Sequence, residues 1–414
     1  MLDTLTLCDM IDRAVREVEI TDVHTHIYST AFGDLLLSGI DELLTYHYLV
    51  SEMFRWVDLP YEEYWAMPKA QQADLVWQTL FVEHSPYSEA CRGVLTVLEK
   101  LGLDVSTRDL EAYRAYFRAM PREEYVNRVF ALSNIREVVM TNDPFDDAER
   151  PTWLHDAPTD PRFKAALRID ALLNSWETAW PRLREWGYAV SEELSEDTLG
   201  EVRRFLRDWM TRISALYLAV SLPPDFRFPE VSVRGTLIAE CILPLCREMD
   251  RPFALMIGVK KLVNPALRLA GDSVGKGDIN VVEYLCAHYP HNKFMVTMLS
   301  RENQHELCVA ARKFRNLLVF GCWWFLNNPS LIDEMTRMRF ELLGLSTIPQ
   351  HSDARVLDQL IYKWEHSRRI IADALFTAYS GIVETGWQVR EEEIRRDVAM
   401  LFGGNFWSFL QRTF

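Results

Sequence analysis

The sequence predicts an α/β fold, a (β/α)8 TIM barrel with a large helical insertion after its first strand. Short apolar segments of strand length recur along the chain, each followed by helical patterning, which is typical of βα units around a parallel sheet. Eight such segments occur in the 414 residues, and this number favours a closed barrel.

The predicted strands are unevenly spaced. They span residues 19–26, 136–141, 164–169, 212–220, 253–258, 293–299, 317–322 and 343–351. The last is the weakest prediction, because Pro349 has no backbone N–H to donate to a neighbouring strand. The first two strands are separated by a long, aromatic-rich, helix-like stretch. We therefore predict a barrel from residues 1–33 and 133–414, with a helical insertion from 34–132 packed on it.

Composition excludes several classes of partner. The chain has 60 acidic and 45 basic residues, a net charge of −15, so we expect no nucleic acid and no anionic membrane as partner. No run approaches the roughly 18 apolar residues of a membrane span, and the N-terminus lacks the pattern of a secretory signal. Seven scattered cysteines without CxxC spacing suggest a reducing, cytoplasmic setting.

A candidate metal site lies at the junction of the first and last predicted strands. His24 and His26 end the first strand, and side chains at i and i+2 of a strand point to the same face. Asp353 follows the last strand, which neighbours the first in a closed barrel. Two histidines and one carboxylate are a common ligand set for a catalytic divalent metal. The candidate cofactor is Zn²⁺; another divalent metal, or none, stays open.

The chain resembles the uronate isomerase family of the amidohydrolase superfamily. His24-Thr25-His26 and Asp353 are similar to the superfamily pattern. The segments that resemble uronate isomerases occur in the family's order: Tyr46-His47-Tyr48, residues 141–147, Arg168-Ile169-Asp170, residues 321–325 and Ser352-Asp353-Ala354-Arg355.

The resemblance implies an intramolecular oxidoreductase of glucuronate catabolism. Uronate isomerases interconvert D-glucuronate with D-fructuronate and D-galacturonate with D-tagaturonate. The expected substrate is therefore a small anionic sugar acid, isomerised from aldose to ketose through an enediolate. We also expect a homo-oligomer, because large barrels with exposed insertions often associate.

This chemistry suggests roles for individual residues. Asp353 is the candidate base beside C2, and the fixed charge of Arg355 suits an enediolate oxygen. The resemblance implies that Tyr48 passes the hydroxyl proton, and His47 beside it is a candidate hydroxyl contact.

Two further residues are candidates for substrate binding. Arg168 is the best-placed guanidinium for the substrate carboxylate, although it could instead form a structural ion pair with Asp170. Trp323 could give the sugar a flat wall. Because adjacent residues at a strand end alternate faces, we expect at most one of Trp323 and Trp324 to face the site.

Some positions depart from the family pattern. Met256 stands where the family has a histidine at strand five, and a thioether is a poor ligand for zinc. Pro224-Asp225-Phe226 lacks the histidine expected after strand four, and Lys261 replaces an arginine. The chain is therefore a divergent member by pattern. A metal-dependent hydrolase of the amidohydrolase type and a catalytically inert binding barrel remain alternatives.

Overall fold

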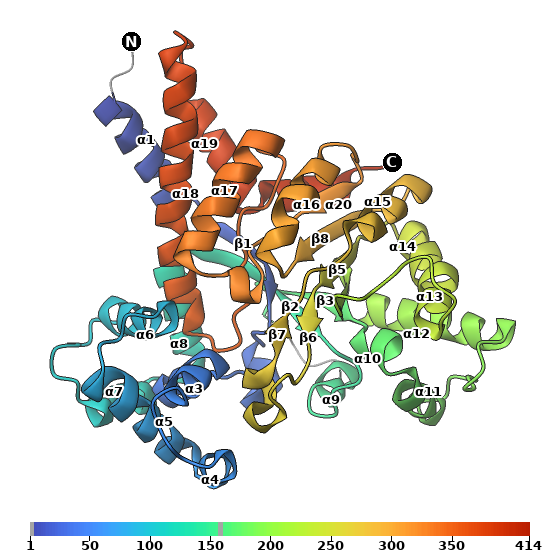
Figure 1. The fold of residues 1–414 in the computed structure, drawn as a ribbon, viewed down its shortest axis with the longest axis horizontal. Coiled ribbons are helices and arrows are strands. Elements are labelled where there is room, and N and C mark those ends of the chain that lie inside the picture. The colour runs from blue at the N-terminus through green and yellow to red at the C-terminus, as the bar shows by residue number, and fades with distance from the viewer. Residues whose placement is uncertain (1–3, 156–159) are drawn as a thin grey trace.

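The computed structural model describes residues 4–155 and 160–414, and a parallel sheet lies at its centre (Figure 1). In the described part of the chain, seven strands are hydrogen-bonded in the order β1-β2-β3-β4-β5-β8-β9, every neighbouring pair parallel. This curled sheet confirms the α/β class and is consistent with a TIM-like barrel. The strands are β1 (Ile20–Thr25), β2 (Ile135–Asn142), β3 (Phe163–Arg168), β4 (Leu218–Leu222), β5 (Phe253–Ile257), β8 (Phe294–Met298) and β9 (Leu317–Val319).

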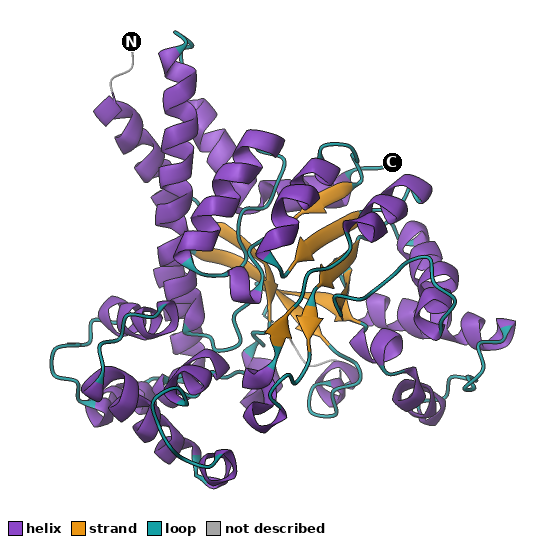
Figure 2. Cartoon of the chain, in the orientation of Figure 1, coloured by secondary structure: helices purple, strands orange, loops and turns teal. Residues whose placement is uncertain are grey.

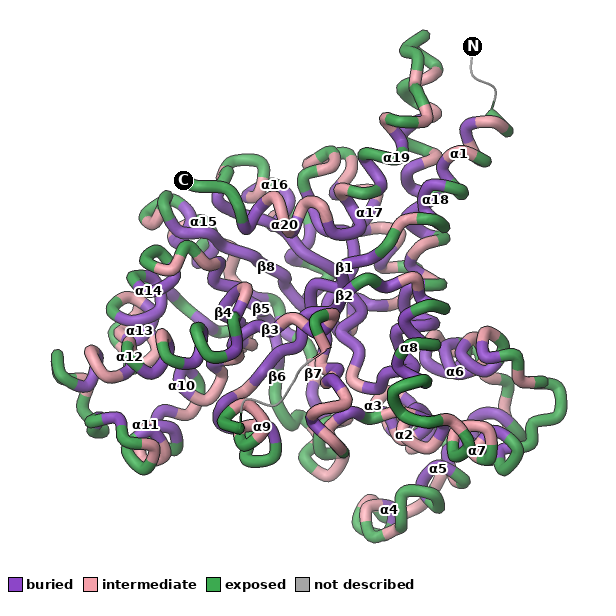
Figure 3. The backbone as a smooth tube through the Cα atoms, turned by 180° about the vertical axis from the view of Figure 1, so that it is seen from behind, coloured by how far each residue is buried: buried purple, intermediate pink, exposed green. Residues whose placement is uncertain are grey.

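Helices surround the sheet, and the strands are buried among them (Figures 2 and 3). The helices outside the stretch between β1 and β2 are α1 (Thr4–Glu17), α9 (Arg150–Leu154), α10 (Asp170–Asn174), α11 (Trp176–Glu185), α12 (Glu196–Arg212), α13 (Val233–Leu237), α14 (Leu243–Glu248), α15 (Ile279–His288), α16 (Gln304–Ala311), α17 (Pro329–Leu343), α18 (Gln359–Glu384), α19 (Glu391–Ala399) and α20 (Asn405–Gln411). Short 3₁₀ or π segments are η1 (Thr30–Leu35), η2 (Gln78–Glu83), η3 (Ile238–Ile242), η4 (Pro265–Gly271), η5 (Arg301–Asn303), η6 (Trp324–Leu326) and η7 (Met400–Gly404).

A two-stranded antiparallel ribbon, β6 (Val259–Lys260) and β7 (Ser273–Val274), follows β5. Within residues 4–155 and 160–414, no helix combines the length and apolar character that a membrane crossing requires.

Most of the predicted strands are confirmed. The first, second, third, fifth and sixth coincide with β1, β2, β3, β5 and β8 to within one residue at each end. The fourth was placed too early: α12 continues to Arg212, so strand pairing begins only at Leu218. The seventh ends sooner than predicted, at Val319.

The predicted eighth strand, residues 343–351, is wrong. Leu343 is the last residue of α17, and only Ile348 pairs, through a single parallel bridge to Phe320. The proline at position 349 cannot donate to a ladder, which explains why pairing stops there. The next residues contact β1 instead: the backbone N–H of Asp353 donates to His24 O at 3.2 Å, and that of His26 donates to Ala354 O at 2.7 Å. An irregular segment therefore bridges the gap between β9 and β1.

A buried carboxylate holds this segment in place. Asp22 on β1 is fully buried and accepts hydrogen bonds from the backbone N–H of Ser352 at 3.1 Å and from Trp364 Nε1 on α18 at 2.8 Å. Burial raises the pKa of Asp22 to about 6, against the effect of these donors. One side chain thus fixes β1, the bridging segment and α18 relative to one another.

The stretch between β1 and β2 is helical, as predicted. It contains α2 (Ile40–Leu44), α3 (His47–Met53), α4 (Tyr61–Ala66), α5 (Lys69–Trp77), α6 (Glu89–Lys100), α7 (Leu110–Ala119) and α8 (Arg122–Ser133), and α3 to α7 lie together on one side in Figure 1. Its buried apolar residues, such as Tyr64 and Val97, belong to one core with Leu360 of α18 and Ile20 of β1. The division into a barrel and a separate insertion stays a prediction.

A second buried carboxylate organises the segment after β2. Glu149 is fully buried, and each of its oxygens accepts two hydrogen bonds. Oε1 accepts from Asn142 Nδ2 at 2.6 Å and Trp153 Nε1 at 3.0 Å. Oε2 accepts from the Tyr28 hydroxyl and the Asp143 backbone N–H, both at 2.9 Å. Burial nevertheless raises the pKa of Glu149 to about 7.

Replacing Asp22 by alanine is expected to lower the free energy of unfolding by about 3 kcal/mol, because two buried donors lose their acceptor. The exposed Asp9 on α1 provides the control, and Asp9→Ala should change stability by less than about 0.5 kcal/mol. Urea unfolding followed by circular dichroism measures both. Equal unfolding midpoints for the two variants would contradict the stabilising role of the hydrogen bonds to Asp22.

Glu149 predicts a pH dependence of stability. Its folded pKa, about 7, exceeds the ordinary 4.5, so the folded state binds this proton more tightly than the unfolded state does. This group's contribution is therefore largest below pH 4.5 and is lost as the pH rises through 7, a change of about 3 kcal/mol. Urea unfolding from pH 4.5 to 7.5 should show that the free energy of unfolding of the parent, minus that of Glu149→Gln, falls by about this amount. A difference between the two proteins that stays constant over this range rules the assignment out.

Candidate active site

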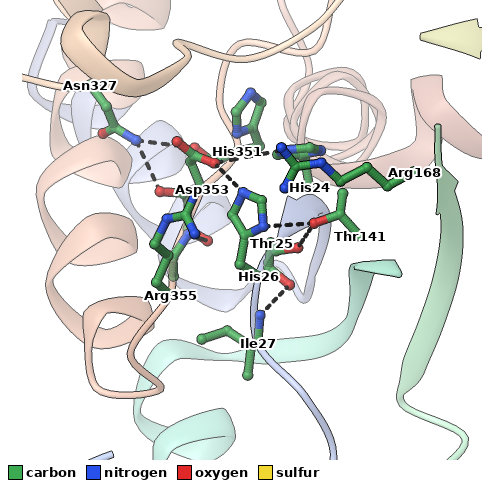
Figure 4. Close-up of polar contacts among 12 residues, drawn as sticks. His24, Thr25, His26, Ile27, Thr141, Arg168, Asn327, His351, Asp353 and Arg355 are labelled. Atoms are coloured by element: carbon green, nitrogen blue, oxygen red, sulfur yellow. Dashed lines mark hydrogen bonds and ion pairs between the residues drawn. The ribbon is translucent and has the colours of Figure 1, made fainter. Parts of the chain in front are cut away.

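All of the predicted site residues except Tyr48 meet in one cavity at the carboxyl ends of the strands, called here the inner cavity. His24, His26, Arg168, Asp353 and Arg355 all line it, and Figure 4 shows His26, Asp353 and Arg355 side by side. The remaining lining residues come from the ends of other strands and from the loops that follow them: His47, Thr141, Asp170, Ala219, Val220, Ser221, Met256, Lys261, Trp323 and Trp324.

The two histidines converge on one carboxylate oxygen. Asp353 Oδ1 lies 3.6 Å from His24 Nε2 and 3.3 Å from His26 Nε2. One ligand atom from each residue lies within 4.8 Å of the others. Asp353 has a φ of 52°, a left-handed conformation that aspartate adopts more readily than most residues. The turn at the end of the bridging segment therefore points this carboxylate at the β1 histidines.

Neighbouring hydroxyls fix the tautomer of each imidazole. The Thr141 hydroxyl donates to Thr25 O at 2.9 Å, so its oxygen accepts from His26 Nδ1, also at 2.9 Å. In the same way, the Tyr217 hydroxyl donates to Val23 O at 2.7 Å and lies 3.3 Å from His24 Nδ1. In both rings the proton sits on Nδ1, and a lone pair on Nε2 faces Asp353.

These atoms fit a divalent cation. His24 Nε2 and Asp353 Oδ1 are buried and have no hydrogen-bond partner among the described residues. Two imidazole lone pairs against a carboxylate oxygen repel one another unless a cation or a proton lies between them. A ligand set of this kind, with each imidazole held through its other nitrogen, is typical of metal sites.

The histidines are neutral near pH 7. Burial lowers the pKa of His24 to about 3, in spite of the opposing charge of Asp353. Burial, and after it the Arg355 guanidinium, holds the pKa of His26 well below its usual range. Both Nε2 lone pairs are therefore available to a metal or to a substrate hydroxyl.

Arg168 both forms an ion pair and faces the cavity. Its Nε and Nη2 donate to the two oxygens of Asp170 at 2.9 and 3.0 Å. This is the ion pair that the sequence offered as an alternative to substrate binding. The Asp170 charge raises the pKa of Arg168, so the guanidinium stays charged. The pair holds Arg168 at the wall of the inner cavity, where Lys261 and Arg355 add positive charge.

Both tryptophans of the 321–325 segment line the inner cavity, so the expectation that at most one does is wrong. Strand alternation does not apply, because β9 ends at Val319 and Trp324 has a φ of 49° at the start of η6. His47 also reaches the cavity, where its Nε2 is buried without a hydrogen-bond partner in the described part of the chain.

Tyr48 is placed differently from its neighbours. It is not among the described residues that line either the inner cavity or the cavity outside it. Its ring stacks on Phe325, with centroids 6.5 Å apart, and the Lys363 ammonium lies 5.5 Å from its centre. Tyr46, to which the sequence assigned no role, lines the outer cavity instead. The role of Tyr48 as proton relay stays a prediction.

Two histidine contacts could not be found from local sequence. Tyr217 lies at the amino side of β4, far from His24 along the chain, and no spacing pattern connects them. His351 does not line the inner cavity; its ring packs beside that of His24, with centroids 5.1 Å apart, and beside Phe320. Both neighbours arise only from the curvature of the sheet.

The inner cavity opens into a larger one, called here the outer cavity, of about 490 Å³. His26, His47, Thr141, Arg168 and Arg355 line both. The stretch between β1 and β2 contributes further walls, including Tyr46 and Trp65, and the segment around η4 contributes Arg268. A small polar ligand can therefore reach the histidines from this side.

No family model matches the chain, and no curated protein sequence matches it. Solved structures do. A uronate isomerase from Bacillus halodurans is 58% identical, with a TM-score of 0.98 over 100% of this chain and 98% of that one. A uronate isomerase from Thermotoga maritima, 15% identical, has a TM-score of 0.79 over 98% of this chain and 97% of that one.

A glucuronate isomerase from Caulobacter crescentus, 13% identical, has a TM-score of 0.77 over 99% of this chain and 94% of that one. At these low identities the last two similarities show the fold alone. The Bacillus halodurans protein, in contrast, matches in sequence along the whole chain. This match shows that the chain belongs to the uronate isomerase family.

Proposed function

We propose that the protein isomerises a hexuronate between its aldose and ketose forms, D-glucuronate to D-fructuronate or D-galacturonate to D-tagaturonate. The observation that carries this proposal is the 58% identity to a uronate isomerase over the full chain. The site supports it, because a carboxylate, two neutral imidazoles and several fixed cations surround one small polar cavity.

The reaction moves a proton from C2 to C1 through an enediolate. Asp353 takes the C2 proton and returns it to C1, since its carboxylate reaches the inner cavity. Arg355 lies two residues on and lines the same cavity, where its charge stabilises the negative oxygen of the enediolate. His47, kept neutral because burial and Arg355 lower its pKa, contacts a substrate hydroxyl.

The other end of the sugar acid requires a cation and an apolar wall. Arg168 binds the substrate carboxylate, and its ion pair with Asp170 holds the guanidinium in one orientation. Trp323 supplies a flat surface beside the sugar. Tyr48, whose ring lies against that of His47, passes the hydroxyl proton in this scheme.

His24, His26 and Asp353 would hold the metal ion, for which Zn²⁺ is our candidate. When bound, the ion supplies a Lewis acid that polarises a sugar oxygen. Met256 lines the inner cavity where the family pattern has a histidine, so the protein offers one ligand fewer. Metal-dependent hydrolysis, which needs a firmly held hydroxide, would depend more on this missing ligand than isomerisation does.

The wider predictions fit this function. Residues 347–354 would close the barrel around the site by occupying the place of an eighth strand. The insertion of residues 34–132 would line the outer cavity. A cytoplasmic setting and a homo-oligomer stay predictions.

Incubation with D-glucuronate or D-galacturonate in D₂O is expected to yield the ketose with deuterium at C1, detected by NMR. Asp353→Asn should lower kcat/KM about 10²–10⁴-fold, because the base is lost. Asp333→Asn, which removes a surface carboxylate paired with Arg337, should match the parent. No exchange with either hexuronate, with or without added Zn²⁺, overturns the isomerase proposal.

Thr141→Val is expected to weaken Zn²⁺ binding about 10–100-fold, because His26 Nδ1 loses the partner that fixes its tautomer. Competition with a chromogenic chelator measures the affinity. Thr178→Val removes a surface hydroxyl of α11 and serves as the control. Unchanged affinity in Thr141→Val would contradict a role for Thr141 in holding His26 as a ligand.

A further inference from the structure

The segment after β2 carries a carboxylate into the outer cavity beside Arg168. Asp143 lines this cavity together with Tyr28 and Arg168. Asp143 Oδ1 accepts a hydrogen bond from the Phe145 backbone N–H at 2.9 Å, which fixes the side chain in a tight turn. Among the described residues, no hydrogen bond uses Asp143 Oδ2.

The electrostatics of Asp143 differ from those of Asp170. Burial raises the pKa of Asp143 to about 6, although the Arg168 charge opposes this. Asp170, in contrast, uses both oxygens in its pair with Arg168. Asp143 is thus a carboxyl group at the cavity wall that lies near the Arg168 guanidinium without forming an ion pair with it.

Glu149 fixes the position of this wall. One of its oxygens accepts from both the Asp143 backbone and the Tyr28 hydroxyl, so the two cavity-lining residues share one buried acceptor. The other oxygen ties Asn142 and Trp153 to the same carboxylate. A glutamine cannot accept all four bonds, because its amide nitrogen would face two donors.

We propose that Asp143 binds the hydroxyl group at C4 of the substrate and distinguishes the two C4 epimers, and that Glu149 is its positioning residue. This inference rests on the proposed function, which sets the orientation of the substrate in the cavity. With C1 and C2 beside Asp353 and the carboxylate on Arg168, C4 and C5 are the hydroxyl-bearing carbons nearest Arg168. D-glucuronate and D-galacturonate share the configuration at C5 and differ at C4. A carboxyl group beside Arg168 is therefore in position to bind the C4 hydroxyl, whose direction separates the two epimers.

The test compares the two epimers in one set of variants. Asp143→Ala should change the ratio of kcat/KM for D-glucuronate to that for D-galacturonate about 10-fold or more, because one epimer loses a hydrogen bond. Glu149→Gln should move the ratio in the same direction by a smaller factor. Asp147→Ala is the matched control: this carboxylate lies in the same segment, its side chain is 87% exposed, and it pairs with Arg182 outside both cavities. Its ratio should equal that of the parent.

A binding measurement separates this inference from the isomerase proposal. D-glucarate and D-galactarate carry the same C4 difference and do not react, so calorimetry with these two aldarates needs no turnover. Loss of epimer selectivity in Asp143→Ala supports the C4 contact even if the parent protein isomerises no hexuronate.

Equal losses for both epimers, or an unchanged ratio, overturn the assignment of Asp143. A ratio that moves in Asp143→Ala but not in a folded Glu149→Gln overturns the positioning role of Glu149. Near-ultraviolet circular dichroism of each variant establishes that it is folded.

Discussion

Closure of the sheet at Asp22 is the constraint on which the active site depends. The carboxylate of Asp22 joins β1 to Ser352, 330 positions away in the sequence, and to Trp364 on α18. Two backbone hydrogen bonds, made by His24 and His26, extend this contact between β1 and the bridging segment. Without these hydrogen bonds Asp353 would have no fixed position relative to the histidines, because residues 347–354 form no regular strand beside β1.

The site also depends on two hydroxyl groups that hold the imidazoles in place. Thr141 and Tyr217 each donate to a backbone carbonyl, and this leaves their oxygens to accept from the imidazoles. Burial then keeps both rings neutral. The result is a pair of lone pairs aimed at one carboxylate oxygen, an arrangement that is costly to bury unless a ligand completes it. Without such a ligand the site therefore lowers the stability of the fold, and a cation or a sugar hydroxyl that binds there restores it.

The stretch between β1 and β2 gives the cavity its depth. Its helices share a core with α18, so they are held firmly against the barrel elements, and Tyr46, His47 and Trp65 line the path to the histidines. Elsewhere in the outer cavity, Glu149 supports Tyr28 and Asp143. The reacting end of the cavity is thus built by strand ends, and the outer end by loops and by this helical stretch.

The sequence by itself determined the strand positions of β1, β2, β3, β5 and β8, because short apolar runs bounded by polar residues leave few alternatives. It also placed His24 and His26 beside Asp353, since residues 347–354 lie next to β1 where an eighth strand would be. Tertiary structure alone decided the rest. The eighth strand was replaced by a bridge because Pro349 and the end of α17 interrupt it, and Trp324 turned into the cavity because its backbone leaves the strand conformation. The contacts of Tyr217 and Glu149 join groups from separate strands and loops. No local pattern encodes such contacts, because they arise from the curvature that brings the strand ends together.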